Sequence, residues 1–352
     1  MIIKKVILFV ASIIKLFILF FYFTINCNAD EISSKRYSAD EGVLSIMYHR
    51  FNESKYPSTN IQMEVFKKHI DIILKSGFSF YNPKNFEKEF SKPKTNKKIL
   101  LTIDDAFRSF YTEAWPYLKK NEIPFILFVS TEPVGKNGYM TWKQIKEIEI
   151  EKFAMIGHHS HSHEHLIDKT YEEFILDIET ADKIFKENLG YIPKMFSYPF
   201  GEYSKKMKDY VSKNFNLGFG QHSGVIDNNK EKFELPRFPI NEKYGELERF
   251  KSIVSYSPLE YKILKPEEKK LINSKNPPSF SVEFFDNQEN INNINCFSNE
   301  GGKWEKSQVK FQKNKLSITF REPFKPRRGR VNCSLNDNGK WRWFGTQFTV
   351  KN

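Results

Sequence analysis

Short apolar runs alternate with longer amphipathic stretches over residues 43–240. Three of these runs are VLSIMY, KILLTID and PFILFVS. Between them, apolar residues recur at helical spacing, as in MEVFKKHIDIILKSG, where the final Gly77 is a helix stop signal. Strands that alternate with helices are typical of an α/β domain with a largely parallel sheet. The pattern predicts such a domain here.

The pattern changes near residue 280 to short alternating runs separated by Asn, Gly and Pro, which predicts a small, sandwich-like all-β domain over 280–352. The preceding stretch, 251–279, is rich in Lys and Glu and contains a Pro pair, which is typical of a linker. We therefore expect a catalytic domain at 30–250, a linker at 251–279 and a β domain at 280–352.

The first 29 residues predict export. Lys4 and Lys5 precede an apolar run, and Ala29 provides a small residue at a cleavage position, as in a signal peptide. An uncleaved membrane anchor is the alternative, because the run approaches the length needed to span a bilayer. After cleavage Cys296 and Cys333 would remain, as one disulfide of an exported protein or as two buried thiols.

The chain is basic, with a formal net charge of +12. This charge is compatible with peripheral association with anionic lipid or with an acidic polymer. The basic residues are dispersed and no nucleic-acid motif accompanies them, so we expect no nucleic-acid partner. Nothing in the sequence indicates an oligomeric state.

Four polar stretches end or follow apolar runs, namely MYHR, LLTIDDAF, IGHHSHSHEHL and FSYPFGEY. Because ligands bind at the carboxyl ends of parallel strands, we expect these stretches to converge. In the second stretch, Asp104 and Asp105 would be costly to bury without compensation, so we expect a cation beside them. The alternative is that both cap the start of a helix.

The third stretch holds five histidines between residues 158 and 165. Two imidazoles four residues apart can meet on one helical face and, with a carboxylate, form a three-ligand catalytic metal site. The pairs with this spacing or nearly so are His159 with His163, His161 with His165, and His158 with His161 or His163. Spacing alone does not choose among them, and an exposed His-rich loop is a further alternative.

These residues resemble the polysaccharide deacetylase family with its NodB-like homology domain. The T-F-D-D-G motif is present as Thr102 to Ala106, the H-[ST]-x-[ST]-H motif as His159 to His163, and the P-[YF]-G motif as Pro199 to Gly201. The resemblance covers about residues 43–245, with the motifs in the family's order. Its opening segment resembles the biofilm poly-N-acetylglucosamine deacetylases. It implies a (β/α) barrel-like catalytic domain, distorted or incomplete.

The resemblance also implies roles for individual residues. Asp105, His159 and His163 would bind a divalent metal, and Asp104 would be the general base. His49 would be the general acid, as in the poly-N-acetylglucosamine subgroup, with a buried structural histidine as the alternative. The backbone amide that follows Pro199 and Phe200 would help to stabilise an oxyanion. Zinc is the default metal for this ligand set, and cobalt, nickel, iron and manganese are also compatible with it.

The sequence departs from the family pattern at several positions. The glycine after the two aspartates is Ala106, and the arginine that opens the third motif is Ser197. We expect Arg237 to supply the missing positive partner for Asp104. Neither the family's fourth motif nor its usual late catalytic histidine is evident, and His222 is a candidate substitute that no motif supports.

The sequence therefore predicts a metal-dependent N-deacetylase that acts on an N-acetylglucosamine-containing polysaccharide outside the cytoplasm. An O-acetyl esterase would use the same metal and base. A non-catalytic carbohydrate-binding protein and a basic structural protein of the cell envelope are the other classes. In the first of these, Trp304, Trp341 and Trp343 would stack on sugars, although core packing is the commoner role of such residues.

Overall fold

The structure is a computed structural model that describes residues 42–92, 96–286, 288 and 290–351. The segment predicted to be a signal peptide or anchor, residues 1–29, lies outside the described residues. Within the described part of the chain, no helix is both long and apolar enough to cross a membrane.

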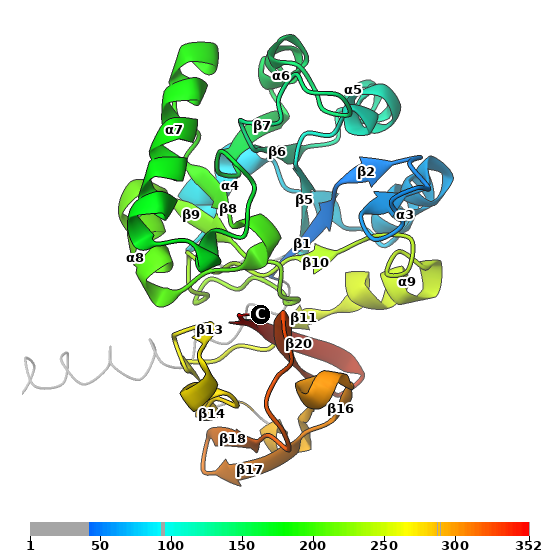
Figure 1. Ribbon diagram of the computed structural model, residues 1–352. Coiled ribbons are helices and arrows are strands. Elements are labelled where there is room, and N and C mark those ends of the chain that lie inside the picture. Colours follow the sequence, from blue (N-terminus) through cyan, green and yellow to red (C-terminus); the bar gives the residue numbers. More distant parts are fainter. Residues whose placement is uncertain (1–41, 93–95, 287, 289, 352) are drawn as a thin grey trace, which may run out of the picture. The chain divides into compact units, whose positions relative to one another are not determined.

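A curved parallel sheet forms the centre of the first part of the chain, with helices around its outer face (Figure 1). The strand order is β10-β1-β5-β6-β7-β8-β9, with β4 beside β5, and every strand pair in this sheet is parallel. The strands are β1 (Val43–Tyr48), β4 (Ser79–Phe80), β5 (Lys98–Asp104), β6 (Phe125–Val129), β7 (Ala154–His158), β8 (Met195–Ser197), β9 (Leu217–Phe219) and β10 (Phe238–Pro239). The predicted barrel-like, incomplete α/β fold is confirmed.

The helices are α3 (Met63–Lys75), α4 (Pro83–Glu89), a π-helix (Phe110–Ala114) continued by α5 (Trp115–Lys120), α6 (Trp142–Glu149), α7 (Tyr171–Leu189), α8 (Lys205–Asn214) and α9 (Leu247–Ser255). Two short strands, β2 (Arg50–Phe51) and β3 (Asn60–Ile61), form a separate pair. The long helix α7 begins at a capping box formed by Thr170 and Glu173 and ends at Gly190, whose φ of 82° is a conformation that favours glycine.

The side chains of β5 alternate between the two faces of the sheet. Leu101 and Ile103 pack outward into the core beneath the helices, whereas Leu100 packs into the core inside the barrel. Because neighbouring residues of a strand face opposite sides, Thr102 and Asp104 share the inner side with Leu100. The last residue of β5 therefore places a carboxylate inside the barrel at its carboxyl edge.

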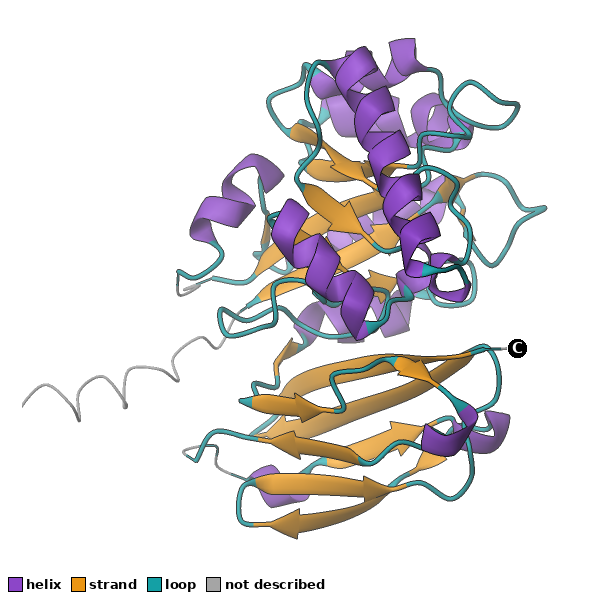
Figure 2. Cartoon of the chain, turned by 60° about the vertical axis from the view of Figure 1, so that its left-hand side comes forward, coloured by secondary structure: helices purple, strands orange, loops and turns teal. Residues whose placement is uncertain are grey.

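The rest of the chain forms two further sheets that share one core (Figure 2). One contains β11 (Ser257–Pro258), β13 (Lys270–Leu271), β15 (Asn295–Ser298), β16 (Glu305–Lys306), β19 (Arg328–Asp337) and β20 (Lys340–Val350), and the other contains β12 (Ile263–Lys265), β14 (Phe280–Glu283), β17 (Gln308–Gln312) and β18 (Lys315–Thr319). The predicted sandwich-like β structure is confirmed. Cys296 and Cys333, paired between β15 and β19, form a disulfide.

The segment predicted to be a linker, 251–279, contributes strands to both of these sheets. Its strands β11 and β13 pair with β20, and β12 pairs with β14. The paired strands explain why this Lys- and Glu-rich segment is ordered, because its backbone polar groups are satisfied in the sheets. The division of the chain at residues 250 and 280 stays a prediction.

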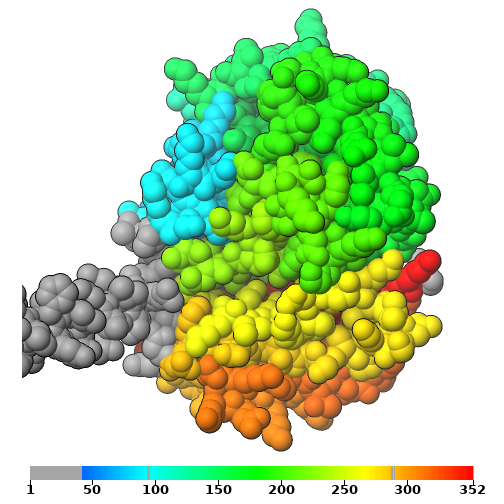
Figure 3. Space-filling model, turned by 90° about the vertical axis from the view of Figure 1, so that its left-hand side faces the viewer, coloured from blue at the N-terminus to red at the C-terminus, as the bar shows by residue number. Residues whose placement is uncertain are grey.

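Charged contacts join the barrel to this segment near α8. The Lys205 amide of α8 donates to Glu268 of the segment at 3.2 Å, whereas the Lys208 ammonium lies 3.0 Å from the Glu234 carboxylate within the barrel. Burial raises the pKa of Glu234, but the charges of Lys269 and Lys208 outweigh it and lower the pKa to about 2. Figure 3 shows this face of the molecule, where the green and yellow surfaces meet.

Candidate metal centre and active site

The structure brings together the three residues expected to bind a metal. One ligand atom from each of Asp105, His159 and His163 lies within 4.8 Å of the others. The Asp105 Oδ1 atom is 3.3 Å from His159 Nε2 and 3.0 Å from His163 Nε2. Two imidazole nitrogens and one carboxylate oxygen supply three of the four ligands of a tetrahedral site, as in catalytic zinc sites whose fourth position is open.

Strand ends and left-handed turns produce this arrangement. The Asp105 amide donates to the Phe128 carbonyl at 3.0 Å just beyond β5, and the His159 amide donates to the Val129 carbonyl at 3.0 Å just beyond β7. Asp105 then turns with a φ of 75°, and His163 has a φ of 54°. Such angles are rare outside glycine and occur mostly where the surroundings enforce them, often at functional sites.

The interpretation of His159 and His163 as neighbours on a helical face is wrong. The segment after β7 is a loop, and the next element is a short 3-10 helix at Leu166–Asp168. The Asp177 carboxylate of α7 holds this loop by accepting hydrogen bonds from the amides of His161 and Ser162 at 2.8 and 3.0 Å. The four-residue spacing places the two imidazoles together through a tight loop instead.

The ligand atoms fit a divalent metal. His159 Nδ1 donates to the Ser197 carbonyl at 2.7 Å, which leaves the lone pair on Nε2 directed toward Asp105. Within the described part of the chain, neither His159 Nε2 nor Asp105 Oδ1 has a hydrogen bond of good geometry, although both atoms are buried. Burial raises the pKa of Asp105, but His163 and His159 outweigh it and hold the pKa well below its usual value. An ionised carboxylate and two neutral imidazoles are the forms that bind metals.

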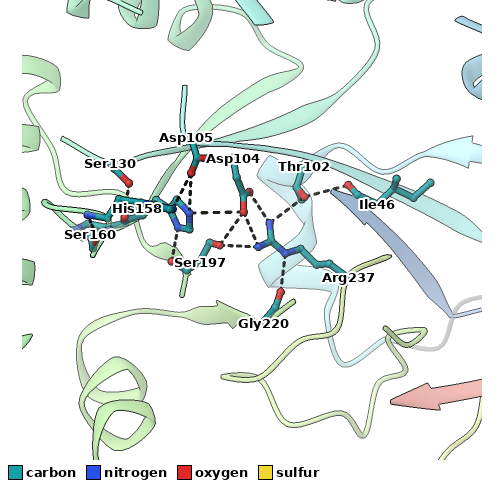
Figure 4. A network of polar contacts seen from close by, with 12 residues as sticks. Ile46, Thr102, Asp104, Asp105, Ser130, His158, Ser160, Ser197, Gly220 and Arg237 are labelled. Carbon is teal, nitrogen blue, oxygen red and sulfur yellow. Dashed lines mark hydrogen bonds and ion pairs between the residues drawn. The ribbon is translucent and has the colours of Figure 1, made fainter. Parts of the chain in front are cut away.

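Arg237 forms a buried bidentate pair with Asp104 (Figure 4). Its two terminal nitrogens donate to the two carboxylate oxygens at 2.7 and 2.8 Å, and both residues are fully buried. The remaining guanidinium donors bond to Ser197 Oγ, Thr102 Oγ1 and the Gly220 carbonyl. Burial raises the pKa of Asp104, but the charge of Arg237, with a smaller contribution from His159, lowers it overall.

The Asp104 carboxylate therefore has a positive partner even though Ser197 occupies the family's arginine position. Ser197 is small, and its hydroxyl lies 2.8 Å from Arg237, which arrives from the start of β10. The alternative that Asp104 and Asp105 cap a helix is wrong, because the next helical residues begin only at Arg108, beyond the left-handed turn at Asp105 and Ala106.

His49 follows β1 at the same edge of the sheet. Its Nδ1 atom is buried and has no hydrogen-bond partner among the described residues. Burial lowers the pKa of His49, whereas the charges of Asp105 and Asp104 oppose this shift. The His49 imidazole therefore lies within electrostatic reach of both carboxylates.

The third motif forms a 3-10 turn, Pro199–Gly201, in which Phe200 has a φ of 58°. The Gly201 amide, which directly follows Phe200, already donates to the Tyr198 carbonyl at 2.8 Å. The amide of Phe200 itself donates no hydrogen bond within the described part of the chain. The centre of the Phe200 ring lies 4.7 Å from the centre of the His163 ring. The Phe200 amide is therefore the better oxyanion candidate.

The other histidines lie outside the ligand cluster. His158 is buried with its Nε2 3.3 Å from Asp182 of α7, and His161 hydrogen-bonds to Thr131 at 2.8 Å. His165 stacks on Phe200 with ring centres 3.9 Å apart. His222, the substitute for the late catalytic histidine, lines a separate pocket, and burial lowers its pKa to about 4.

Sequence reasoning missed the residues that hold the Phe200 turn from the far side. Glu202 pairs with His165 at 2.9 Å and with Arg327 at 2.6 Å. The Gln347 amide group donates to the carbonyls of Phe200 and Gly201, both at 3.3 Å. Only Glu202 could have been singled out from the sequence, because it directly follows the third motif. Gln347 lies in β20 and Arg327 directly precedes β19, far from that motif in the sequence.

In the comparison with known families, residues 91–217 fit the model described as polysaccharide deacetylase. The chain contains a polysaccharide deacetylase domain. The Asp-Asp, His-rich and Pro-Phe-Gly motifs all lie within this range, whereas His49 and Arg237 lie outside it.

Relatives and solved structures agree with this assignment. A poly-beta-1,6-N-acetyl-D-glucosamine N-deacetylase of Staphylococcus aureus is 22% identical over 245 residues, which cover 61% of this chain and 84% of the relative. The structure of IcaB from Ammonifex degensii has a TM-score of 0.55 at 24% identity and covers 61% of this chain and 97% of its own. The structure of the deacetylase PplD of Streptococcus pyogenes has a TM-score of 0.53 at 21% identity. The match covers 57% of this chain and 93% of PplD. At these identities, the solved structures support the fold.

Proposed function

We propose that this polysaccharide deacetylase is a metal-dependent enzyme that removes N-acetyl groups from an N-acetylglucosamine-containing polysaccharide outside the cytoplasm. The observation that carries the proposal is the ligand cluster of Asp105, His159 and His163 beside an Asp104 fixed by Arg237. Similarity to the Staphylococcus aureus enzyme supports a β-1,6-linked polymer as the first substrate to test. The disulfide and the pattern of residues 1–29 support export.

A divalent cation, zinc by default, would polarise the acetamide carbonyl and lower the pKa of a water molecule when bound by these three residues. Asp104 accepts the proton of the attacking water on a carboxylate lone pair that Arg237 leaves free. The Phe200 amide donates a hydrogen bond to the carbonyl oxygen as its negative charge develops. His49 protonates the sugar nitrogen as the carbon–nitrogen bond breaks, which releases acetate and the free amine.

The candidate general acid His49 favours this reaction over O-acetyl ester hydrolysis. An amine is a poor leaving group without protonation, whereas an alcohol leaves with much less assistance. Among the described residues, the buried Nδ1 atom of His49 has no hydrogen-bond partner, which supports a role in proton delivery. The complete ligand set argues against a non-catalytic carbohydrate-binding protein or a purely structural one.

The test is acetate release from β-1,6-linked poly-N-acetylglucosamine, from chitooligosaccharides and from an O-acetylated glycan. His159→Ala is expected to lose bound metal and activity together, and Asp104→Asn to keep metal but lose about 100- to 10,000-fold in rate. His161→Ala is the matched control, since this histidine bonds to Thr131 outside the cluster, and it should keep both. Metal-independent release, or equal activity of all variants, would contradict the proposal.

A further inference from the structure

A second pocket, about 270 Å³ in volume, lies outside the ligand cluster. Residues of β10, α9, β19 and β20 line it together with three loops, and Figure 1 shows β10 and α9 beside β20. Its lining includes Tyr244, Arg249, Trp304, Arg330, Asn332 and Trp343. The volume is near the lower limit of small-ligand sites, about 300 Å³. A pocket of this size suits one sugar unit.

Aromatic rings form two different walls of this pocket. Trp343 stacks on Tyr256 with ring centres 5.1 Å apart, and its indole nitrogen donates to Ser223 at 3.0 Å, so this wall is fixed. Trp304 and Tyr244 are 48% and 38% exposed, although large aromatic side chains are usually buried. Exposed aromatic rings at the mouth of a partly polar pocket are typical of a binding site, because a sugar's apolar face packs on them.

The side chains that line the pocket among the described residues carry a net positive charge. Arg249 and Arg330 line it, and the lining contains neither Asp nor Glu. The Arg249 side chain donates to the Tyr244 carbonyl, and the Arg330 side chain bonds to Gln347 at 3.2 Å. Burial lowers the pKa of both guanidinium groups. The lining therefore favours a ligand with acceptor oxygens and no positive charge.

The pocket is linked to the candidate active site through Gln347. This side chain accepts from Arg330 at the pocket and donates to the carbonyls of Phe200 and Gly201 in the third-motif turn. A single side chain therefore contacts both the pocket wall and the turn beside His163. A polymer whose reacting sugar lies at the ligand cluster has further sugar units available to occupy such a neighbouring pocket.

We propose that this pocket is a subsite for an uncharged, N-acetylated sugar unit of the same polymer, and that it excludes the deacetylated, cationic unit. The inference rests on the proposed function. An acetylated unit presents amide and hydroxyl oxygens to Arg249, Arg330 and Asn332, and a ring face to Trp304. A glucosamine unit carries an ammonium group that the two guanidiniums repel. A cation already lies over the Tyr244 ring, because the Arg249 guanidinium is 5.0 Å from its centre.

The experiment measures equilibrium binding of N-acetylglucosamine and glucosamine tetramers to the metal-free full chain, so that no turnover occurs. The wild type should bind the acetylated tetramer at least about tenfold more tightly, a difference near 1.4 kcal/mol. Trp304→Ala should weaken acetylated-tetramer binding by about tenfold. Trp341→Ala is the matched control, because Trp341 is 42% exposed but does not line the pocket, and it should bind normally. Arg249→Gln should reduce the ratio of the affinity for the acetylated tetramer to the affinity for the glucosamine tetramer.

Equal binding by Trp304→Ala and the wild type would overturn the subsite, and so would equal affinity for the two tetramers. Both outcomes are independent of acetate release. A wild type that releases no acetate but shows Trp304-dependent binding would instead overturn the proposed function and keep the subsite. Circular dichroism checks that the exposed substitutions leave the fold intact.

Discussion

The ligand cluster and the C-terminal strands hold the same turn, Pro199–Gly201, from two sides. On one side the His163 ring contacts Phe200, and on the other Gln347 binds the carbonyls of the turn and Arg327 binds the adjacent Glu202. The ligands come from short motifs, whereas Arg327 lies 125 residues from Glu202. The comparison indicates that short motifs supply the reactive groups and that distant residues fix the loop that completes the site.

Removing the Arg237 guanidinium should have the largest effect on the motif side. Arg237→Ala leaves the buried Asp104 carboxylate without its partner, which typically costs about 3–5 kcal/mol of unfolding free energy. Urea unfolding measures the loss, and acetate release should fall with it because Asp104 is no longer held in place.

Two further variants separate the effect of the Arg237 charge from that of its bidentate geometry and from a general loss of an arginine. Arg237→Lys keeps the charge but loses the bidentate geometry, so it should recover stability more than rate. Arg321→Ala removes an arginine paired with Glu300 within the C-terminal sheets and should leave the rate unchanged. A normal rate and stability in Arg237→Ala would show that Asp104 does not depend on this pair.

A variant of the buried Glu234 tests the electrostatic contact between the barrel and the C-terminal part of the chain, which contributes Lys269. Its folded pKa of about 2 lies below the ordinary value of 4.5, so the ionised form stabilises the fold. This contribution, on the order of 3 kcal/mol, is complete above pH 4.5 and is lost as the pH falls from 4.5 toward 2. Glu234→Gln should therefore be less stable than the wild type at pH 7, and the difference should shrink toward pH 2.

Chemical denaturation at a series of pH values measures this difference. Glu231→Gln is the matched control, since Glu231 is exposed and lies three residues away. A constant difference between Glu234→Gln and the wild type from pH 7 to 2 would show that Lys269 and Lys208 do not stabilise the carboxylate.

Arg327 tests whether the C-terminal strands position the active-site turn. Its guanidinium binds Glu202 and also Asp168 at 2.6 Å. Arg327→Gln should lower kcat about tenfold through a small displacement of the turn, with metal content unchanged. Arg321→Gln is the control from the same sheets. A loss of stability with unchanged kcat would mean that Arg327 is only structural.

The sequence predicted the strand ends well and the loops poorly. Asp104 and His159 follow apolar runs, so the parallel sheet places both at one edge. The path from His159 to His163 was not predictable, because it depends on left-handed residues and on the Asp177 carboxylate of α7. Arg237 was predictable only from the missing arginine at Ser197. Arg327 and Gln347 gave no signal, because their partners lie more than 100 residues away.

The smallest expected effect concerns Ala106, where the family has glycine. Its φ is 53°, a conformation that costs an L-residue about 1–2 kcal/mol relative to glycine. Ala106→Gly relieves this cost, but it removes a buried methyl group and increases the conformational entropy of the unfolded chain. The free energy of unfolding should therefore change by less than about 1 kcal/mol. Ala114→Gly loses the same methyl at a buried position with a φ of −88° and gains no relief. The first variant should therefore be about 1–2 kcal/mol more stable than the second, and equal urea midpoints would show that the turn after Asp105 accommodates alanine without strain.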